Sequence, residues 1–241
     1  MRIQALCRYP VKSLLGESCQ ELDLDGRGVV GDRAFALADT AGKLGSGKTT
    51  TRFTRMDGLF SLRARSFENR VLISFPDGRE FDIEDPAINH ELSAYLERQV
   101  MAVAENEIPH FDDGAVHVLL SSELARLQRL VPDAQIDCRR FRANMVLDAP
   151  DHMRDDDLIG KVLTLGDAKL EVTHETERCR MVTMAQDELR FEPAVLKMIV
   201  QETGMNFGVY ARVIQRGRIH AGQSVDLSAQ PRAHRISDSL R

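Results

Sequence analysis

The stretch Glu171–Met184, EVTHETERCRMVTM, combines a strand-like run with a short polar interruption. The β-branched residues of its first part predict a strand, and Met181–Met184 resume the apolar pattern as a second strand after a tight turn. The turn holds one thiol, Cys179, between the guanidiniums of Arg178 and Arg180. Fixed positive charge favours the thiolate form of a neighbouring thiol, which attacks electrophiles and binds soft metals. The competing interpretation is a half-buried cysteine that has arginine neighbours by chance.

Composition excludes several classes of protein. The net charge of −5 argues against a general nucleic-acid binder. No apolar run approaches the roughly 18 residues that a membrane span needs, and the first residues, MRIQ, lack the features of a signal peptide. The four cysteines lie far apart without a CxxC pair, which excludes zinc-ribbon and cysteine-ligated iron–sulfur spacings. We therefore expect a reduced, cytoplasmic protein without a membrane span.

The chain predicts mostly short strands and few helices. Up to about residue 105, strands alternate with Gly, Pro and Asp turns, and a helix follows Asp85; this pattern favours a barrel-like β subdomain. Apolar strands are predicted at Val116–Leu120 and Lys161–Leu165. A helix is predicted from Pro193 to a closing Gly204. The whole pattern is that of an α+β fold that is predominantly β.

Polar residues interrupt the chain where predicted strands end. Lysine and arginine at such positions suit phosphate recognition, because guanidiniums offer fork-shaped donors. A β framework that holds one soft thiolate among anion-binding donors suggests a cofactor with both a phosphate and a soft metal. Taken singly, each piece also fits a solvated loop, and we read His117 as a core histidine. The residues concerned are Lys12, Ser13, Arg33, Arg142, Asn144, Arg178, Cys179 and Tyr210.

A second motif points elsewhere. The segment Gly42–Thr49, GKLGSGKT, satisfies the P-loop pattern GxxxxGK[ST], in which backbone amides cradle a nucleotide phosphate. A P-loop needs a buried strand before the segment and a helix directly after it. Thr49–Thr51 is a poor helix start, because β-branched residues lose rotamer freedom there. A mobile hairpin tip competes with the nucleotide-binding interpretation.

The ordered motifs resemble a known family. Tyr-Pro-Val-Lys-Ser from Tyr9, followed by Gly-Asp-Arg from Gly31, is similar to the N-terminal barrel of MOSC proteins. The motifs Arg-Phe-Arg-Ala-Asn, Arg-Cys-Arg-Met-Val-Thr and Phe-Gly-Val-Tyr resemble the MOSC domain itself. The resemblance implies an N-terminal β-barrel domain at 1–105, a β-barrel MOSC domain with a few peripheral helices at 106–228, and a flexible tail at 229–241.

The resemblance also implies a molybdenum cofactor. Cys179 matches the family's thiolate ligand to molybdenum and would be the catalytic residue. The matching cofactor contacts are Lys12, Ser13, Arg33, Arg142, Asn144, Arg178 and Tyr210. Members similar to the mitochondrial amidoxime-reducing component reduce N-hydroxylated compounds by oxygen-atom transfer. Here the residues after the Arg-Cys pair differ from the usual Thr-Thr and Pro/Gly turn, which implies a different substrate pocket.

Two activities follow from the resemblance. The first is a molybdenum-dependent oxidoreductase that acts on a small N-hydroxylated or N-oxygenated molecule. Because the chain lacks a ferredoxin segment, its electrons would come from a separate donor protein of the ferredoxin, flavoprotein or cytochrome b5 type. The second is a module that carries or sulfurates the cofactor, with Cys179 as a persulfide and no turnover of its own.

Overall fold

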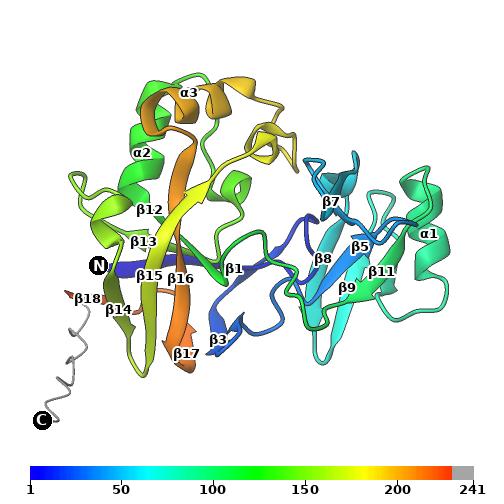
Figure 1. The fold of residues 1–241 in the computed structure, drawn as a ribbon, viewed down its shortest axis with the longest axis horizontal. Helices are drawn as coiled ribbons and strands as arrows, with labels where there is room; N and C mark the ends of the chain where they lie inside the picture. Colours follow the sequence, from blue (N-terminus) through cyan, green and yellow to red (C-terminus); the bar gives the residue numbers. More distant parts are fainter. Residues whose placement is uncertain (230–241) are drawn as a thin grey trace, which may run out of the picture.

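The structure is a computed structural model that describes residues 1–229. It has two lobes side by side (Figure 1). The large lobe combines β1–β4 with everything from β12 onward, and the small lobe contains β5–β11 and helix α1. The segments after β1 and β4 therefore leave the large lobe for the small one, and polar residues on both segments come to lie between the lobes.

The large lobe is built on an eight-stranded sheet in the order β18-β14-β15-β16-β12-β13-β1-β2. Its pairings are antiparallel except for β12 with β13. A three-stranded sheet, β17-β3-β4, lies beside it. The strands are β1 (Arg2–Arg8), β2 (Glu17–Cys19), β3 (Glu21–Asp25), β4 (Gly28–Val29), β12 (Val116–Leu120), β13 (Met145–Asp148), β14 (Lys161–Leu165), β15 (Ala168–Glu177), β16 (Asn206–Gln215), β17 (Gly217–His220) and β18 (Asp226–Ala229).

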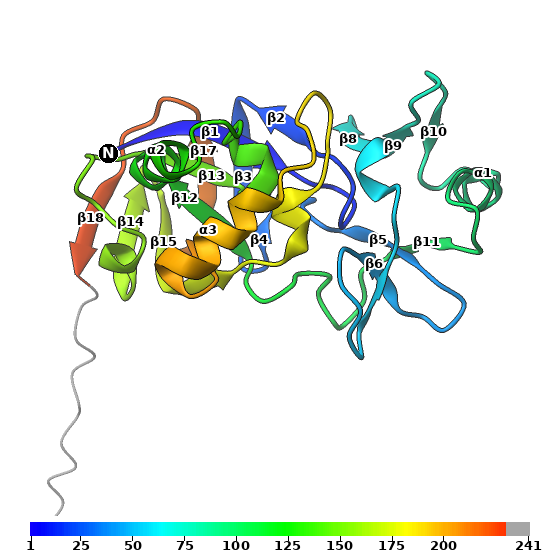
Figure 2. The same ribbon diagram turned by 90° about the horizontal axis from the view of Figure 1, so that it is seen from above.

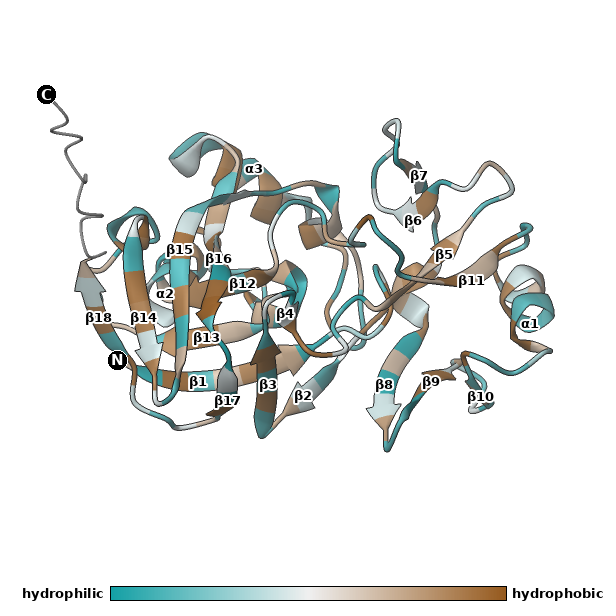
Figure 3. Cartoon of the chain, turned by 60° about the horizontal axis from the view of Figure 1, so that its bottom comes forward, coloured by the Kyte–Doolittle hydropathy of each residue, from teal (hydrophilic) through white to brown (hydrophobic). Residues whose placement is uncertain are grey.

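The core of the large lobe follows the alternation of its strands. Inward-facing residues such as Leu120, Leu163 and Val209 are fully buried, and hydrophobic segments recur along β3, β12 and β14 (Figure 3). Burial of this kind contributes about 25 cal/mol per Å² of apolar surface.

Two helices cover part of the large sheet (Figure 2). α2 (Ser121–Leu130) and α3 (Pro193–Thr203) pack against each other and against the sheet. α3 begins at a proline, which suits the first helical turn, and ends before Gly204 in the left-handed region. Short 3₁₀ turns complete the lobe: η2 (Cys138–Phe141), η3 (Asp156–Leu158) and η4 (Arg180–Thr183).

The small lobe has two further sheets and its own apolar core. One sheet has the order β11-β5-β6-β7 and the other β10-β9-β8. Leu37, Leu62, Ile73 and Leu92 are almost completely buried within the lobe. The elements are β5 (Phe35–Ala38), β6 (Leu44–Ser46), β7 (Phe53–Arg55), η1 (Leu59–Ser61), β8 (Arg63–Phe67), β9 (Arg70–Ser74), β10 (Glu80–Asp82), α1 (Ile88–Tyr95) and β11 (Met101–Ala104).

The structure confirms the predominantly β, α+β class and the strands at Val116–Leu120 and Lys161–Leu165. The four sheets are open, since no pairing among residues 1–229 closes one on itself. The division at residue 105 stays a prediction, although β1 pairs with β13 and β3 pairs with β17, both of which belong to the second half. Of the predicted tail, residues 230–241 lie outside the described residues.

Two sequence predictions are wrong. Met181–Met184 is not a strand: β15 continues to Glu177, and η4 follows, with the amide of Val182 donating to the carbonyl of Cys179 at 3.2 Å. Met181 packs with apolar side chains of the N-terminal part, and this packing outweighs strand propensity. The P-loop interpretation also fails, because strand β6 lies inside Gly42–Thr49 and the next element is a strand instead of a helix.

The helices of the described chain are short. None of them within residues 1–229 is both long and apolar enough to cross a bilayer.

Candidate functional site

A cavity of about 60 Å³ lies between the two lobes and brings together most of the predicted site residues. It is much smaller than the ~300–1,000 Å³ of ordinary ligand pockets. Five side chains that line it were predicted from the sequence: Arg33, Arg142, Arg178, Cys179 and Tyr210. The remaining lining residues are Lys48, Asp112, His117, Phe141, Glu177 and Met181.

The turn after β1 supplies a buried ammonium. Lys12 is 3% exposed and its Nζ donates to Asp112 Oδ1 at 2.8 Å. Nζ also lies 4.5 Å from the centre of the Phe53 ring, a cation–π contact. Burial lowers the pKa of Lys12 to about 8, although the Asp112 carboxylate opposes this shift. The ammonium is therefore held at the site mainly by one carboxylate.

Arg33 is fixed by its neighbour Asp32 and by the backbone of Arg142 in the large lobe. Its Nη1 pairs with Asp32, and its Nη2 donates to the carbonyl of Arg142 at 3.2 Å. The Asp32 carboxylate also accepts a hydrogen bond from the amide of Tyr9 at 2.7 Å, which connects the segment after β4 to the segment after β1. Burial opposes the charge of Arg33, but Asp32 raises its pKa above the usual value. The charge of Arg33 is thus balanced within the protein.

Arg142 differs from Arg33, because no carboxylate within residues 1–229 forms an ion pair with it. Its Nη1 donates to the carbonyl of Leu14 at 2.5 Å, and its guanidinium stacks 4.3 Å from the centre of the Tyr9 ring. Its Nη2 is buried and has no hydrogen-bond partner among residues 1–229. Burial and the nearby charge of Arg33 lower its pKa to about 10. A buried donor without a partner costs about 1–3 kcal/mol, so this atom points to a missing acceptor.

Arg178 shows the same deficit beside the thiol. Its Nη2 donates to the carbonyl of Phe141 at 2.7 Å, and its Nη1 lies 3.5 Å from His117 Nε2. Its Nε is buried without a partner in the described part of the chain. Burial lowers the pKa of Arg178 below the usual range. The cavity therefore has two buried guanidiniums, those of Arg142 and Arg178, each with a free donor and without an ion-pair partner among residues 1–229.

Cys179 lies at the junction between β15 and η4. The amide of the preceding Arg178 donates to the carbonyl of Met205 at 2.7 Å, which holds the end of β15 against β16. Cys179 is half-buried and its thiol is free of any disulfide. Beyond it, a Cβ on Gly47 would come within 2.3 Å of Met181 Cγ, so only glycine lets the β6–β7 segment approach here. The thiol thus faces a cavity whose walls come from both lobes.

Two rings from the large lobe complete the cavity. Tyr210 on β16 lies between His117 and His174, with ring centres 5.5 Å and 5.4 Å away. Burial raises the pKa of Tyr210 and, together with Arg178, lowers the pKa of His117 well below its usual value. Gly208 reaches His117 closely at a φ of +86°, a conformation that favours glycine. A neutral imidazole and a neutral phenol therefore face the site.

Three predicted contacts, Lys12, Ser13 and Asn144, are not among the residues that line the cavity, and the last two bind backbone groups. The Ser13 hydroxyl donates to the carbonyl of Gly45 at 2.9 Å. The Asn144 amide accepts from the amide of His117 at 3.1 Å and donates to the carbonyl of Cys7 at 3.3 Å. Both side chains therefore connect backbone segments around the site, and their roles as cofactor contacts stay predictions.

Backbone strain gathers at the predicted residues. Seven non-glycine residues have a positive φ in the described chain, and Ser13, Arg33 and Arg142 are among them. Such a conformation costs roughly 1–3 kcal/mol, and it persists where surrounding contacts impose it, often at functional sites. Here the predicted residues with this conformation are Ser13, in the turn after β1, and Arg33 and Arg142, whose guanidiniums line the cavity between the lobes.

Sequence reasoning missed Asp112 and Lys48, and it assigned His117 to the core without placing it at the site. Lys48 belongs to the false P-loop, and its Gly-Ser-Gly-Lys turn was the available signal. Asp112 lies 100 residues from its partner Lys12, so no local pattern announces the pair. His117 is a buried histidine, as the sequence suggests, but it also lines the cavity.

Comparisons with known proteins identify the family. Residues 1–126 match the MOSC N-terminal beta barrel domain, and residues 90–226 match the MOSC domain. The chain belongs to the MOSC family. That family is associated in general with the molybdenum cofactor. No curated protein matches the chain.

Solved structures share the fold. The YuaD protein from Bacillus subtilis is 14% identical, with 95% of this chain and 96% of that chain covered and a TM-score of 0.53. A protein described as hypothetical is 13% identical over 95% of this chain and 70% of its own, with a TM-score of 0.50. YiiM from Escherichia coli is 13% identical over 96% and 71%, with a TM-score of 0.47. These identities are low, so the similarity shows the fold alone.

The residues present fit a phosphate-bearing cofactor with a soft metal. The orphaned donors of Arg142 and Arg178 call for an anionic acceptor, and Cys179 offers one soft ligand next to them. No group of three or more His, Cys, Asp or Glu within residues 1–229 could hold a metal ion. A metal at Cys179 would therefore need most of its ligands from the cofactor.

Proposed function

We propose that this MOSC protein binds a molybdenum cofactor between its lobes and acts as an oxidoreductase on small N-hydroxylated or N-oxygenated compounds. The observation that carries the proposal is the pair of buried, unpaired guanidiniums beside a free thiol. Membership of the MOSC family and the resemblance to amidoxime-reducing members support the choice of cofactor and substrate.

Each residue then has a defined task. Lys12, Arg33 and Arg142 would bind the cofactor phosphate, and Arg178 would bind an acceptor near the metal. Cys179 would hold the metal through its sulfur. When bound, the cofactor supplies oxygen-atom transfer coupled to two electrons. Tyr210 stays protonated at neutral pH because burial raises its pKa, so it can donate a hydrogen bond to a ligand.

A separate protein would supply the electrons. The four cysteines lack iron–sulfur spacing, so the sequence offers no internal cluster for this step. We propose a ferredoxin, a flavoprotein or a cytochrome b5-type donor.

Metal content tests the cofactor directly. Wild type, Cys179→Ala and Cys138→Ala would be purified from a host that makes the cofactor, and molybdenum would be measured by mass spectrometry. Cys138 is the matched control, because it is a half-buried free cysteine next to Arg139 that does not line the cavity. We expect near-stoichiometric molybdenum in wild type and Cys138→Ala and a loss in Cys179→Ala. Metal retained in Cys179→Ala would remove the role of the thiol, and metal absent from all three would refute the cofactor.

A carrier role is the second candidate, and the partial exposure of Cys179 favours it, since a persulfide must be reachable by an acceptor protein. Reduction of an N-hydroxylated compound with an artificial electron donor would support the oxidoreductase. Cofactor or sulfur transfer to an apo-enzyme without such turnover would support the carrier.

A further inference from the structure

One carboxylate lies among the cations of the interlobe cavity. Asp112 accepts from Lys12 Nζ at 2.8 Å and lines the same cavity as Arg33, Arg142 and Arg178. Burial raises the pKa of Asp112, but the neighbouring cations outweigh this effect and lower the pKa to about 2. Lys12 makes the largest contribution among them, followed by Arg33 and Lys48. Asp112 is therefore ionised at neutral pH and forms the ion-pair partner of Lys12.

The two members of the pair are anchored differently. The Lys12 side chain is 3% exposed, whereas the Asp112 side chain is 47% exposed. The segment around Asp112 is fixed on both sides: Arg52 donates to the carbonyl of Phe111 at 3.2 Å, and a Cβ on Gly114 would overlap the Tyr210 ring. The Lys12 ammonium is therefore enclosed by protein, whereas the Asp112 carboxylate borders the solvent.

Two further donors beside the cavity have no acceptor in the described chain, so the site could bind a second anion. Beside the Lys12–Asp112 pair, the orphaned donors Arg142 Nη2 and Arg178 Nε lack an acceptor. The free space beside these donors is about 60 Å³, which is smaller than an ordinary ligand pocket. Because Asp112 is the carboxylate that pairs with Lys12, an anionic ligand that binds Lys12 competes with it.

We propose that Asp112 is an internal counter-ion that stands in for the anionic group of the ligand and competes with it for Lys12. With no ligand bound, the carboxylate neutralises the buried ammonium. When a phosphate-bearing ligand enters, its oxygens replace the carboxylate, which rotates toward solvent. This inference rests on the proposed function for the identity of the ligand, and the anion site itself is what the experiment probes.

The probe is inorganic phosphate, because it carries the anionic group without the remainder of the cofactor. Phosphate affinity would be measured by calorimetry at about pH 6, where Lys12, with a pKa of about 8, is charged. The variants are Asp112→Asn, which removes the competing charge, Asp112→Glu, which restores it, and Asp113→Asn. Asp113 is the matched control, because it is the next residue, 70% exposed, and pairs with His174 instead of Lys12.

We expect Asp112→Asn to bind phosphate about tenfold more tightly than wild type, since Coulomb competition at short range is removed. Asp112→Glu and Asp113→Asn should bind as wild type does. Equal or weaker binding by a folded Asp112→Asn, with wild type binding phosphate, would overturn the inference and leave the proposed cofactor untouched. Absence of phosphate binding in every variant would overturn both the inference and the anion site of the proposed function. Thermal unfolding checks that each variant is folded.

Discussion

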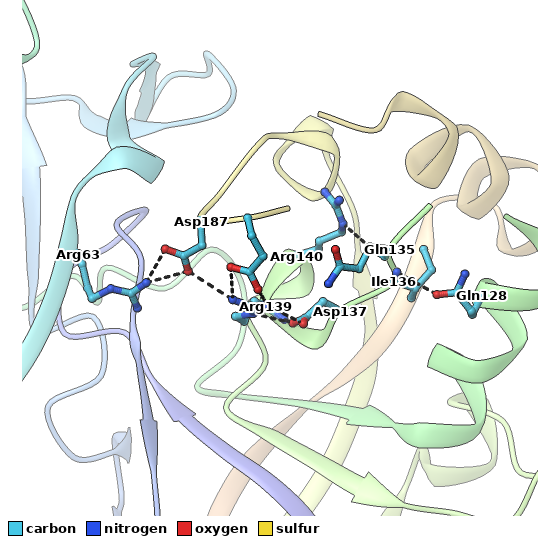
Figure 4. A network of polar contacts seen from close by, with 9 residues as sticks. Arg63, Gln128, Gln135, Ile136, Asp137, Arg139, Arg140 and Asp187 are labelled. Atoms are coloured by element: carbon cyan, nitrogen blue, oxygen red, sulfur yellow. Dashed lines mark hydrogen bonds and ion pairs between the residues drawn. The ribbon is translucent and has the colours of Figure 1, made fainter. Parts of the chain in front are cut away.

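Arg140 and Arg142 lie two residues apart, and both are buried, yet their guanidiniums are satisfied to different degrees. Arg140 donates to the carbonyls of Gln135 and Arg190, each at 2.9 Å, and to that of Met184 at 3.4 Å. Figure 4 shows Arg140 beside a network in which Asp187 joins Arg63 of the small lobe to Arg139 of the large lobe. Arg142 instead keeps one donor without a partner.

This difference in hydrogen bonding suggests that the Arg140 charge stabilises the fold and that the Arg142 charge is available to a ligand. A guanidinium that serves the structure finds acceptors in the chain itself, because an unsatisfied buried donor costs stability. A guanidinium that binds a ligand keeps free donors at the ligand position, and these unpaired donors lower the stability of the ligand-free protein. From this difference we propose a structural task for Arg140 and a ligand-binding task for Arg142, although the sequence around them, Arg-Arg-Phe-Arg, treats them alike.

Removal of Arg140 should give the largest effect on stability. Arg140→Met leaves three backbone carbonyls without their donor, and each buried orphan costs about 1–3 kcal/mol. We expect the free energy of unfolding to fall by about 4 kcal/mol in urea titrations. Phosphate affinity of the folded protein should stay at the wild-type level. A variant that unfolds like wild type would show that the carbonyls find other partners.

Asp155 is a buried carboxylate that, like Arg142, has one polar atom without a partner in the described chain. Asp155 accepts from the amide of Gly208 at 2.7 Å through Oδ2, but its Oδ1 has no partner within residues 1–229. Burial, with a smaller contribution from Glu123, raises its pKa to about 7 against the lowering effect of the amide. Since the folded pKa lies above the unfolded value of about 3.9, the unfolded state holds fewer protons between these values, and stability falls as the pH rises from about 4 to about 7.

Asp155→Asn keeps the acceptor for Gly208 and removes the titration. We expect this variant to gain about 2 kcal/mol relative to wild type between about pH 4 and pH 8, roughly half of what the full shift represents. The gain should appear as a smaller loss of unfolding free energy with rising pH. Asp156→Asn is the control, because Asp156 is exposed next to it. Parallel pH profiles for wild type and Asp155→Asn would contradict the raised pKa.

The sequence predicted the parts of this comparison that depend on local pattern. Val116–Leu120 was found because a continuous apolar run flanked by polar residues predicts a buried strand. Arg142 and Arg178 were identified because each lies in a polar stretch beside a predicted strand and in a motif that resembles the MOSC domain. What the sequence did not reveal is which donors remain free, since that depends on distant carbonyls such as those of Leu14 and Phe141.

The errors have the same physical origin. Met181–Met184 has the composition of a strand, but contact with the N-terminal segment turns it into a 3₁₀ helix. Ser13 and Asn144 are not errors, because their roles as cofactor contacts stay predictions, but their hydrogen bonds to backbone groups likewise depend on segments that only the folded chain brings near. Tertiary contacts over long separations decided each case, and local propensity carries no information about them.

Removal of Arg142 should reverse the result for Arg140. Arg142→Met eliminates a buried charge with an unpaired donor and breaks one hydrogen bond to Leu14, so the two effects on stability oppose each other. We expect the free energy of unfolding to change by less than about 1 kcal/mol, while phosphate affinity falls at least about tenfold, as the loss of a charge-assisted hydrogen bond requires. A loss of stability as large as that of Arg140→Met would mean that Arg142 is structural.

Lys48 should give the smallest effect, and it tests how far the site extends. It lines the cavity but is exposed, with its Nζ 6.0 Å from the centre of the Phe53 ring, so solvent screens its charge. We expect Lys48→Met to weaken phosphate binding about twofold at low salt and to have no effect at about 0.5 M salt. Lys43→Met is the control, because Lys43 donates to the carbonyl of Thr50 and lines a different pocket. A much larger loss of phosphate affinity, or nucleotide binding that depends on Lys48, would contradict this expectation. Either result would mean that the Gly-Ser-Gly-Lys turn itself binds phosphate. The ligand-binding charges would then extend into the small lobe.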